Sequence, residues 1–156
     1  MIPISRPLIG QEEIESVIQV LKSGIIASGP KVKEFERAFA SYTGVKHAVA
    51  VSNGTCAIHS ALFSLSVGAG DRVIVPPFTF IATSNSVIHA GAEPVFADIE
   101  EESFNLDPDK VEEILKKDKK GKIKAVICVH LFGRPCEMDR FARISAKYGV
   151  KIIEDA

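Results

Sequence analysis

The 156-residue sequence lacks the features that would direct a protein to a membrane, out of the cell or onto nucleic acid. No run approaches the roughly 18 apolar residues that a membrane-spanning helix needs. The first residues do not follow the basic and then apolar pattern of a signal peptide. The formal net charge of −1 offers little attraction to nucleic acid or to an anionic membrane. We therefore expect a cytoplasmic protein with no nucleic-acid or membrane partner.

Cysteine is scarce, and its spacing argues against both disulfides and zinc. Cys56, Cys128 and Cys136 form no CxxC pair and leave an odd thiol, which fits reduced thiols better than a disulfide scaffold. The pairs Cys128 with His130 and Cys56 with His59 do not have the spacing of a structural zinc site, and no second pair completes four ligands. We expect no metal.

Motifs of several common enzyme classes are also missing. There is no GxGxxG fingerprint and no Walker loop, so a dinucleotide or a nucleoside triphosphate is a weak prediction. No serine or cysteine has a nucleophile elbow or a partnered base, so nucleophilic hydrolysis is unsupported. The basic residues 116–120 lie between a predicted helix and a predicted strand, which favours a solvated turn over a polyanion site.

The residues that are present have the balance of a globular domain, with 46% hydrophobic and 25% charged residues. In the first third, apolar residues recur at helical spacing up to Ser23-Gly24, and again from Gly29-Pro30 to Gly44. Two helices are predicted there. Residues 25–30 are apolar but not periodic, so we expect an exposed loop that suggests a partner surface.

From residue 47 onward, short apolar runs alternate with helical patterns. Strands are predicted at residues 47–51, 72–75, 94–97, 125–129 and 151–153. Helices are predicted around residues 57–65, 81–88, 111–115 and 138–144. With no internal repeat or linker, this is an α/β domain, or part of one, with a mostly parallel sheet and helices on both faces.

In open sheets of this kind, ligands bind beyond the carboxyl ends of the strands. Residues 52–55 follow the first predicted strand and open a helix, whose first turn attracts phosphate through unpaired N–H groups and the helix dipole. Gly54 would let the backbone approach closely, and the Thr55 hydroxyl could add a donor. The alternative is ordinary helix capping without a ligand.

Three further residues lie at predicted strand ends. Phe80 could form one wall for a planar ligand, although an aromatic side chain there is more often core. Asp155 needs a cation or a donor, because an unpaired carboxylate is costly to bury, and a protonated ring nitrogen would serve. A salt bridge or a helix cap are the alternatives for Asp155. His130 either contacts a ligand or is a hydrogen-bonded structural histidine.

The order and spacing of several segments are more specific than any single residue. They are Ile4-Ser5-Arg6-Pro7, Ser23-Gly24, Gly29-Pro30, Gly70-Asp71, Glu154-Asp155-Ala156 and residues 48–55, 77–83, 91–96 and 129–133. Over essentially its whole length the chain resembles the DegT/DnrJ/StrS family of sugar aminotransferases, which are fold-type I pyridoxal-phosphate (PLP) enzymes.

The resemblance implies a cofactor and its contacts. Gly54 and Thr55 would hold the phosphate of PLP, Phe80 would stack on the pyridine ring, and Asp155 would pair with the ring nitrogen. A protonated pyridine withdraws electrons from the carbanion that forms when the α-proton of the amine leaves. The family also forms homodimers whose active sites share residues across a two-fold axis.

The chain departs from the family in its extent. Residues 1–156 correspond to the N-terminal part of the PLP-binding large domain, and the Schiff-base lysine and the C-terminal small domain have no counterpart here. The expected function is amino transfer from an amino acid such as glutamate to a nucleotide-linked keto-sugar, with this chain alone inactive. The alternatives are a PLP-dependent or PMP-dependent sugar dehydratase, in which histidine replaces the lysine, and a non-catalytic truncated remnant acting as a binding module.

Overall fold

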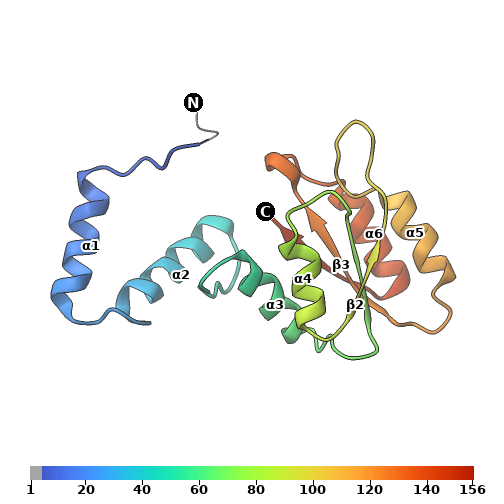
Figure 1. Ribbon diagram of the computed structural model, residues 1–156, viewed down its shortest axis with the longest axis horizontal. Helices are drawn as coiled ribbons and strands as arrows, with labels where there is room; N and C mark the ends of the chain where they lie inside the picture. Colours follow the sequence, from blue (N-terminus) through green and yellow to red (C-terminus); the bar gives the residue numbers. More distant parts are fainter. Residues whose placement is uncertain (1–4) are drawn as a thin grey trace. The chain divides into compact units, whose positions relative to one another are not determined.

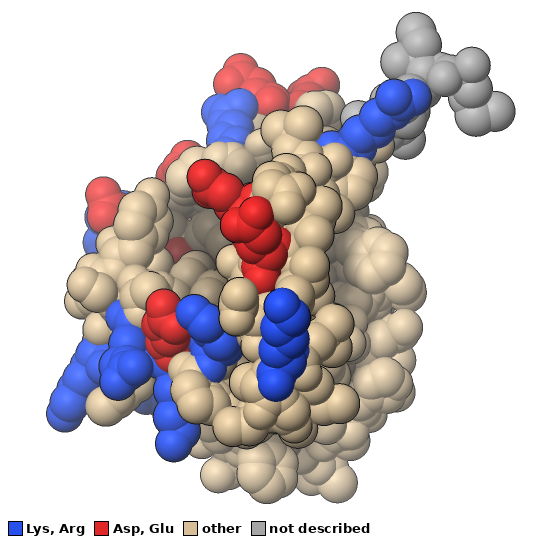
Figure 2. All heavy atoms as spheres, turned by 90° about the vertical axis from the view of Figure 1, so that its left-hand side faces the viewer, with Lys and Arg blue, Asp and Glu red and all other residues tan. Residues whose placement is uncertain are grey.

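The computed structural model describes residues 5–156, and these divide between Ala50 and Val51 into two compact units (Figure 1). Ile4, in the first segment that carries the resemblance, lies outside the described residues. Acidic and basic side chains both occur on the face drawn in Figure 2, with wide areas of uncharged residues, in keeping with a net charge of −1.

The first unit contains the two predicted helices, α1 (Gln11–Ser23) and α2 (Pro30–Thr43). Gly24 and Gly44 end them in the left-handed conformation, at φ 73° in both cases, which glycine adopts without steric cost. Ala40 is the only buried residue among residues 5–50, so the apolar faces of both helices stay uncovered within this unit. Ile25 and Ile26 are exposed as predicted.

The predicted strand at residues 47–51 is wrong, because the structure gives this segment no regular secondary structure. A strand exists only through hydrogen bonds to a neighbouring strand, and within residues 5–156 no ladder includes this segment. Its Ala50 N–H instead donates to the Glu36 carboxylate at 2.9 Å. Val49 remains exposed.

The second unit is built on a four-stranded sheet with the order β2-β1-β3-β4, in which every pair is parallel. Its strands are β1 (Arg72–Val75), β2 (Glu93–Phe96), β3 (Ile123–Val129) and β4 (Lys151–Asp155). The other four predicted strands are therefore confirmed. Because all strands run the same way, their carboxyl ends meet at one edge of the sheet.

Helices cover both faces of this sheet, as predicted (Figure 1). Val73 and Ile127 point to a core with α3 (Gly54–Ser64) and α4 (Ala82–His89). The alternate residues Ile74 and Val126 point to a core with α5 (Pro108–Lys117) and α6 (Met138–Tyr148). A short 3-10 turn, η1 (Leu131–Gly133), follows β3. No helix in the described part of the chain is long and apolar enough to cross a membrane.

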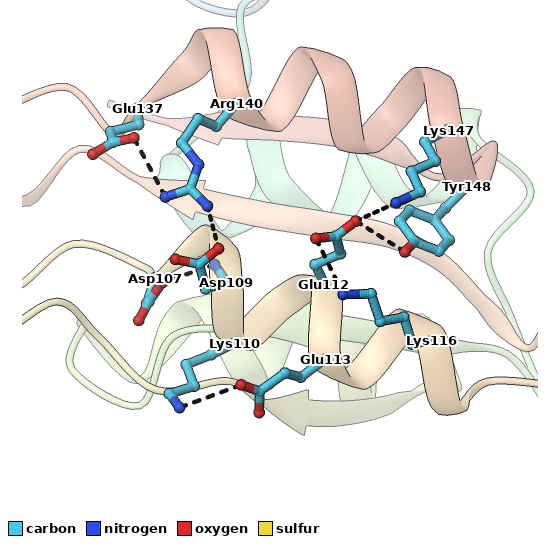
Figure 3. A network of polar contacts seen from close by, with 10 residues as sticks. All are labelled: Asp107, Asp109, Lys110, Glu112, Glu113, Lys116, Glu137, Arg140, Lys147 and Tyr148. Carbon is cyan, nitrogen blue, oxygen red and sulfur yellow. Dashed lines mark hydrogen bonds and ion pairs between the residues drawn. The ribbon is translucent and has the colours of Figure 1, made fainter.

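An ion-pair network joins α5 to α6 at the surface (Figure 3). The Glu112 carboxylate accepts hydrogen bonds from Lys147 Nζ at 2.6 Å and from the Tyr148 hydroxyl at 3.0 Å, and Lys116 lies 3.4 Å away. These contacts, led by the one from Lys147, lower the pKa of Glu112 to about 2. Arg140 of α6 and Asp109 of α5 form a second ion pair between the two helices.

Candidate active site

Two adjacent carboxylates end β4, and they belong to opposite faces of the sheet because strand side chains alternate. Glu154 follows Ile152 on the α5/α6 face, and Asp155 follows Ile153 on the α3/α4 face. The backbone ladder holds both in place: His130 N–H donates to the Asp155 carbonyl oxygen at 2.9 Å, just beyond the last β3–β4 pair. The strand therefore presents Asp155 towards the helices α3 and α4.

The Asp155 carboxylate meets a hydroxyl from α4. Thr83 Oγ1 donates to Asp155 Oδ2 at 3.2 Å, and Thr79 Oγ1 lies 3.0 Å from Thr83 Oγ1. Within residues 5–156, no lysine or arginine lies within ion-pair distance of Asp155. The carboxylate is partly exposed and keeps capacity to accept further hydrogen bonds.

The first turn of α3 is open. Asn53 caps it, with its side-chain oxygen accepting from Cys56 N–H at 2.9 Å. In the part of the chain that the structure describes, no acceptor lies against the N–H groups of Gly54 and Thr55. A Cβ added at Gly54 would meet no atom within 4 Å. The turn is thus both a capped helix start and an accessible set of donors for an anion.

Helix α4 links the predicted site residues to one another. Ser86 Oγ lies 2.7 Å from the Ala82 carbonyl oxygen of its own helix and 3.2 Å from the Thr55 carbonyl oxygen in the first turn of α3. The Phe80 carbonyl oxygen accepts from Thr83 N–H at 3.1 Å. The Phe80 side chain is 78% exposed, so its interpretation as a core residue is wrong. The structure therefore brings Thr55, Phe80 and Asp155 into contact with one helix.

His130 belongs to the other face and makes structural contacts. Its Nε2 lies 2.9 Å from Glu154, and its Nδ1 accepts from Cys136 N–H at 3.2 Å. Burial acts to lower the pKa of His130, but the side chains of Glu154 and Cys136 outweigh it, so the net shift is upward. In the described residues, no three His, Cys, Asp or Glu side chains are placed to hold a metal ion.

The neighbouring thiols, Cys128 and Cys136, are buried and free. The Cys128 thiol does most to lower the pKa of Cys136, and His130 lowers it further. Burial acts in the opposite direction, but the net shift is downward. The Cys136 Sγ nevertheless lies 3.2 Å from the Val129 carbonyl oxygen, a contact that favours the protonated thiol. This contact and its burial make Cys136 a packed thiol in the core.

Two cavities of the described structure lie away from Asp155. One of about 530 Å³ opens at the start of β1 and β2, between Arg72 and Lys122. Another of about 550 Å³ lies within the first unit, between Val17 and Phe35. Neither cavity is lined by a predicted site residue.

Three hydroxyls beside the site were not assigned a role from the sequence. Thr79, Thr83 and Ser86 belong to the segment after β1, where they look like small residues within an apolar helical pattern. One signal was available. Thr79 comes shortly after β1 and Thr83 lies in the first turn of α4, so both follow the carboxyl end of a predicted strand, where ligands bind.

The chain matches the DegT/DnrJ/EryC1/StrS aminotransferase family over residues 7–156. It is 46% identical over 155 residues to the spore coat polysaccharide biosynthesis protein SpsC of Bacillus subtilis, covering 99% of this chain and 39% of that protein. It is 41% identical to the GDP-perosamine synthase of Caulobacter vibrioides, covering 99% and 41%. The chain thus spans about two fifths of the length of these relatives.

Solved structures agree with these relatives. An aminotransferase from Psychrobacter cryohalolentis superposes with a TM-score of 0.89 at 39% identity, over 97% of this chain and 38% of that one. The PLP form of a sugar aminotransferase from Streptococcus pneumoniae gives a TM-score of 0.91 at 35% identity, over 99% and 42%. The predicted fold class, the large domain of fold-type I PLP enzymes, is confirmed. The parallel sheet and the match over residues 7–156 identify this chain as a member of the DegT/DnrJ/EryC1/StrS aminotransferase family.

Proposed function

We propose that this chain is the N-terminal part of the large domain of a PLP-dependent sugar aminotransferase and that its α3/α4 edge binds the cofactor. The observation that carries the proposal is the position of Asp155. Its carboxylate ends the sheet, hydrogen-bonded to Thr83 and facing the side of the sheet whose other helix presents free N–H groups.

The residues at this edge fit PLP. The open first turn at Gly54 and Thr55 suits a phosphate dianion, because N–H donors and the helix dipole both favour negative charge. The exposed ring of Phe80 suits a planar aromatic group. The partly exposed carboxylate of Asp155 suits a protonated ring nitrogen.

When bound, PLP supplies an electron sink for the carbanion formed at the amino-bearing carbon. The residues of this chain bind and orient it. Asp155 would hold a proton at the ring nitrogen, since a nearby carboxylate favours the charged form of a cationic group. Gly54 and Thr55 would anchor the phosphate, and Phe80 would fix the plane of the ring.

The proposal also names the two substrates. An amino acid such as glutamate donates the amino group, and a nucleotide-linked keto-sugar accepts it. The GDP-perosamine synthase among the relatives supports a nucleotide-linked sugar, since its name refers to a GDP-linked amino sugar. The full-length protein acts as a cytoplasmic homodimer in this proposal, and the uncovered apolar side chains of α1 and α2 offer a surface that a second copy can bury.

The test uses the full-length gene product with PLP, L-glutamate and nucleotide-linked keto-sugars. We expect absorption from bound cofactor, and 2-oxoglutarate formation that continues only when a keto-sugar is supplied, with the aminated sugar identified by mass spectrometry. Loss of water from the sugar without glutamate consumption would instead indicate a dehydratase. Absence of cofactor binding by the full-length protein would reject the proposal.

A further inference from the structure

The hydroxyls of two threonines form a chain of hydrogen bonds that ends at the Asp155 carboxylate. Thr79 Oγ1, Thr83 Oγ1 and Asp155 Oδ2 are separated by 3.0 Å and 3.2 Å in that order. Thr79 and Asp155 are partly exposed, whereas Thr83 between them is only 1% exposed. The middle hydroxyl is therefore shielded from water and depends on its two neighbours for hydrogen bonds.

The direction of these hydrogen bonds follows from the chemistry of the groups. An ionised carboxylate only accepts, so Thr83 donates its single hydroxyl hydrogen to Asp155. Having used that hydrogen, Thr83 accepts from Thr79, whose hydroxyl becomes the outer donor. The line thus runs from Thr79 through Thr83 to Asp155, and each bond polarises the next.

The backbone holds Thr83 firmly. Its N–H donates to the Phe80 carbonyl oxygen at 3.1 Å in the first turn of α4, and Val87 of the same helix is fully buried against the sheet. A threonine side chain in a helix is largely confined to two χ1 rotamers, so its hydroxyl has few alternative positions. Asp155, in contrast, lies at the end of β4 and has a carboxylate that can rotate.

We propose that Thr83 is a positioning residue for Asp155: its hydroxyl fixes the carboxylate orientation, which leaves Oδ1 directed to the ring nitrogen of the cofactor. The Thr79 hydroxyl donates to Thr83 and so supports this orientation. This inference rests on the proposed function. It gives the hydroxyls of Thr79 and Thr83, through Asp155, a role in how firmly the ring nitrogen holds its proton. Thr83 itself does not contact the cofactor in this account.

The test compares Thr83→Val, which keeps the shape but removes the hydroxyl, with Thr83→Ser, which keeps the hydroxyl. Ser84→Ala is the matched control, because Ser84 is a buried hydroxyl of the same helix whose one hydrogen bond within residues 5–156 goes to the Ile81 carbonyl oxygen. The full-length protein is titrated with PLP by absorption, and the absorption of the bound cofactor is then titrated with pH. Thermal unfolding without cofactor reports the fold of each variant.

We expect Thr83→Val to weaken PLP binding by up to about tenfold, because an Asp155 carboxylate without its hydrogen bond to Thr83 pairs less well with the ring nitrogen. The midpoint of the cofactor's pH titration should also fall, because a misdirected carboxylate retains the ring proton less well. Thr83→Ser should restore both values, and Ser84→Ala should match the wild type. If Thr83→Val fails to fold, Thr79→Val, at a partly exposed position, should show a smaller effect in the same direction.

A wild-type protein that binds PLP, together with a Thr83→Val variant of equal affinity and equal pH midpoint, would overturn this inference alone. Equal impairment of Thr83→Ser and Thr83→Val would also overturn it, because packing of the methyl groups would then be the cause. A wild type that binds no PLP would reject the proposed function and this inference with it.

Discussion

The two faces of the parallel sheet use their polar groups in different ways. On the α5/α6 face, Glu112, Arg140 and their neighbours pair with groups of opposite charge (Figure 3). On the α3/α4 face, the carboxylate of Asp155 meets hydroxyls, with no cation beside it in residues 5–156.

This difference separates stability from function within one small fold. Charges that neutralise one another have little capacity left for a ligand, whereas a carboxylate bound only by a neutral hydroxyl can still attract a cation. The open donors at Gly54 and Thr55 lie on that same face. We therefore expect substitutions on the α5/α6 face to change the free energy of unfolding, and substitutions at the α3/α4 edge to change cofactor binding.

The largest effect on stability is expected for Phe141→Ala. Phe141 of α6 is fully buried in the α5/α6 core, and truncating such a side chain costs about 3–5 kcal/mol of unfolding free energy. Denaturant unfolding of the full-length protein measures it. The matched variant is Phe80→Ala at the exposed edge, which should change stability by less than about 0.5 kcal/mol but weaken PLP binding several-fold. A reversal of these two outcomes would contradict the division between the faces.

A smaller, pH-dependent effect is expected for Glu112→Gln. The contacts with Lys147 and Tyr148 lower the pKa of Glu112 from 4.5 to about 2. A lowered carboxyl pKa stabilises the fold above pH 4.5, and this contribution is lost as the pH falls towards 2. Melting temperatures of wild type and variant should differ most above pH 5 and converge below it. A constant difference across that range would mean that the ion pairs are not its source.

The smallest effect is expected for Glu154→Gln. Because the pKa of His130 is raised from its ordinary value of 6.5, its ion pair with Glu154 stabilises the fold below that pH and is lost as His130 deprotonates. Glu154 is half exposed, so the contribution should stay below about 1 kcal/mol. Unfolding at pH 5.5 and at pH 8.5 measures it. A larger difference at pH 8.5 would contradict the assignment.

Most of the fold could be predicted from periodicity, because β3 is buried on both faces and reads as a continuous apolar run. A similar apolar run at residues 47–51 gave a wrong strand prediction, because composition shows only that a segment could form a strand. Within residues 5–156, no neighbouring strand pairs with this segment. Val49 illustrates this: it is β-branched and apolar, yet exposed.

The site could be predicted in part. A carboxylate at the end of an apolar strand indicated Asp155, and alternation places Glu154 on the other face. Whether Phe80 is core or exposed depends on what packs above it, which sequence does not report. Thr83 was missed because a buried threonine in a helix looks like a small apolar residue until its distance to Asp155 is known.

The most direct test of the account compares the two adjacent carboxylates of β4 in the full-length enzyme. Asp155→Asn should leave PLP bound and the melting temperature near that of the wild type, while amino transfer slows by at least about a hundredfold. Glu154→Gln should retain near-normal amino transfer at the same pH. Near-normal turnover by Asp155→Asn, or an equal loss in both variants, would contradict the claim that the α3/α4 face carries the chemistry.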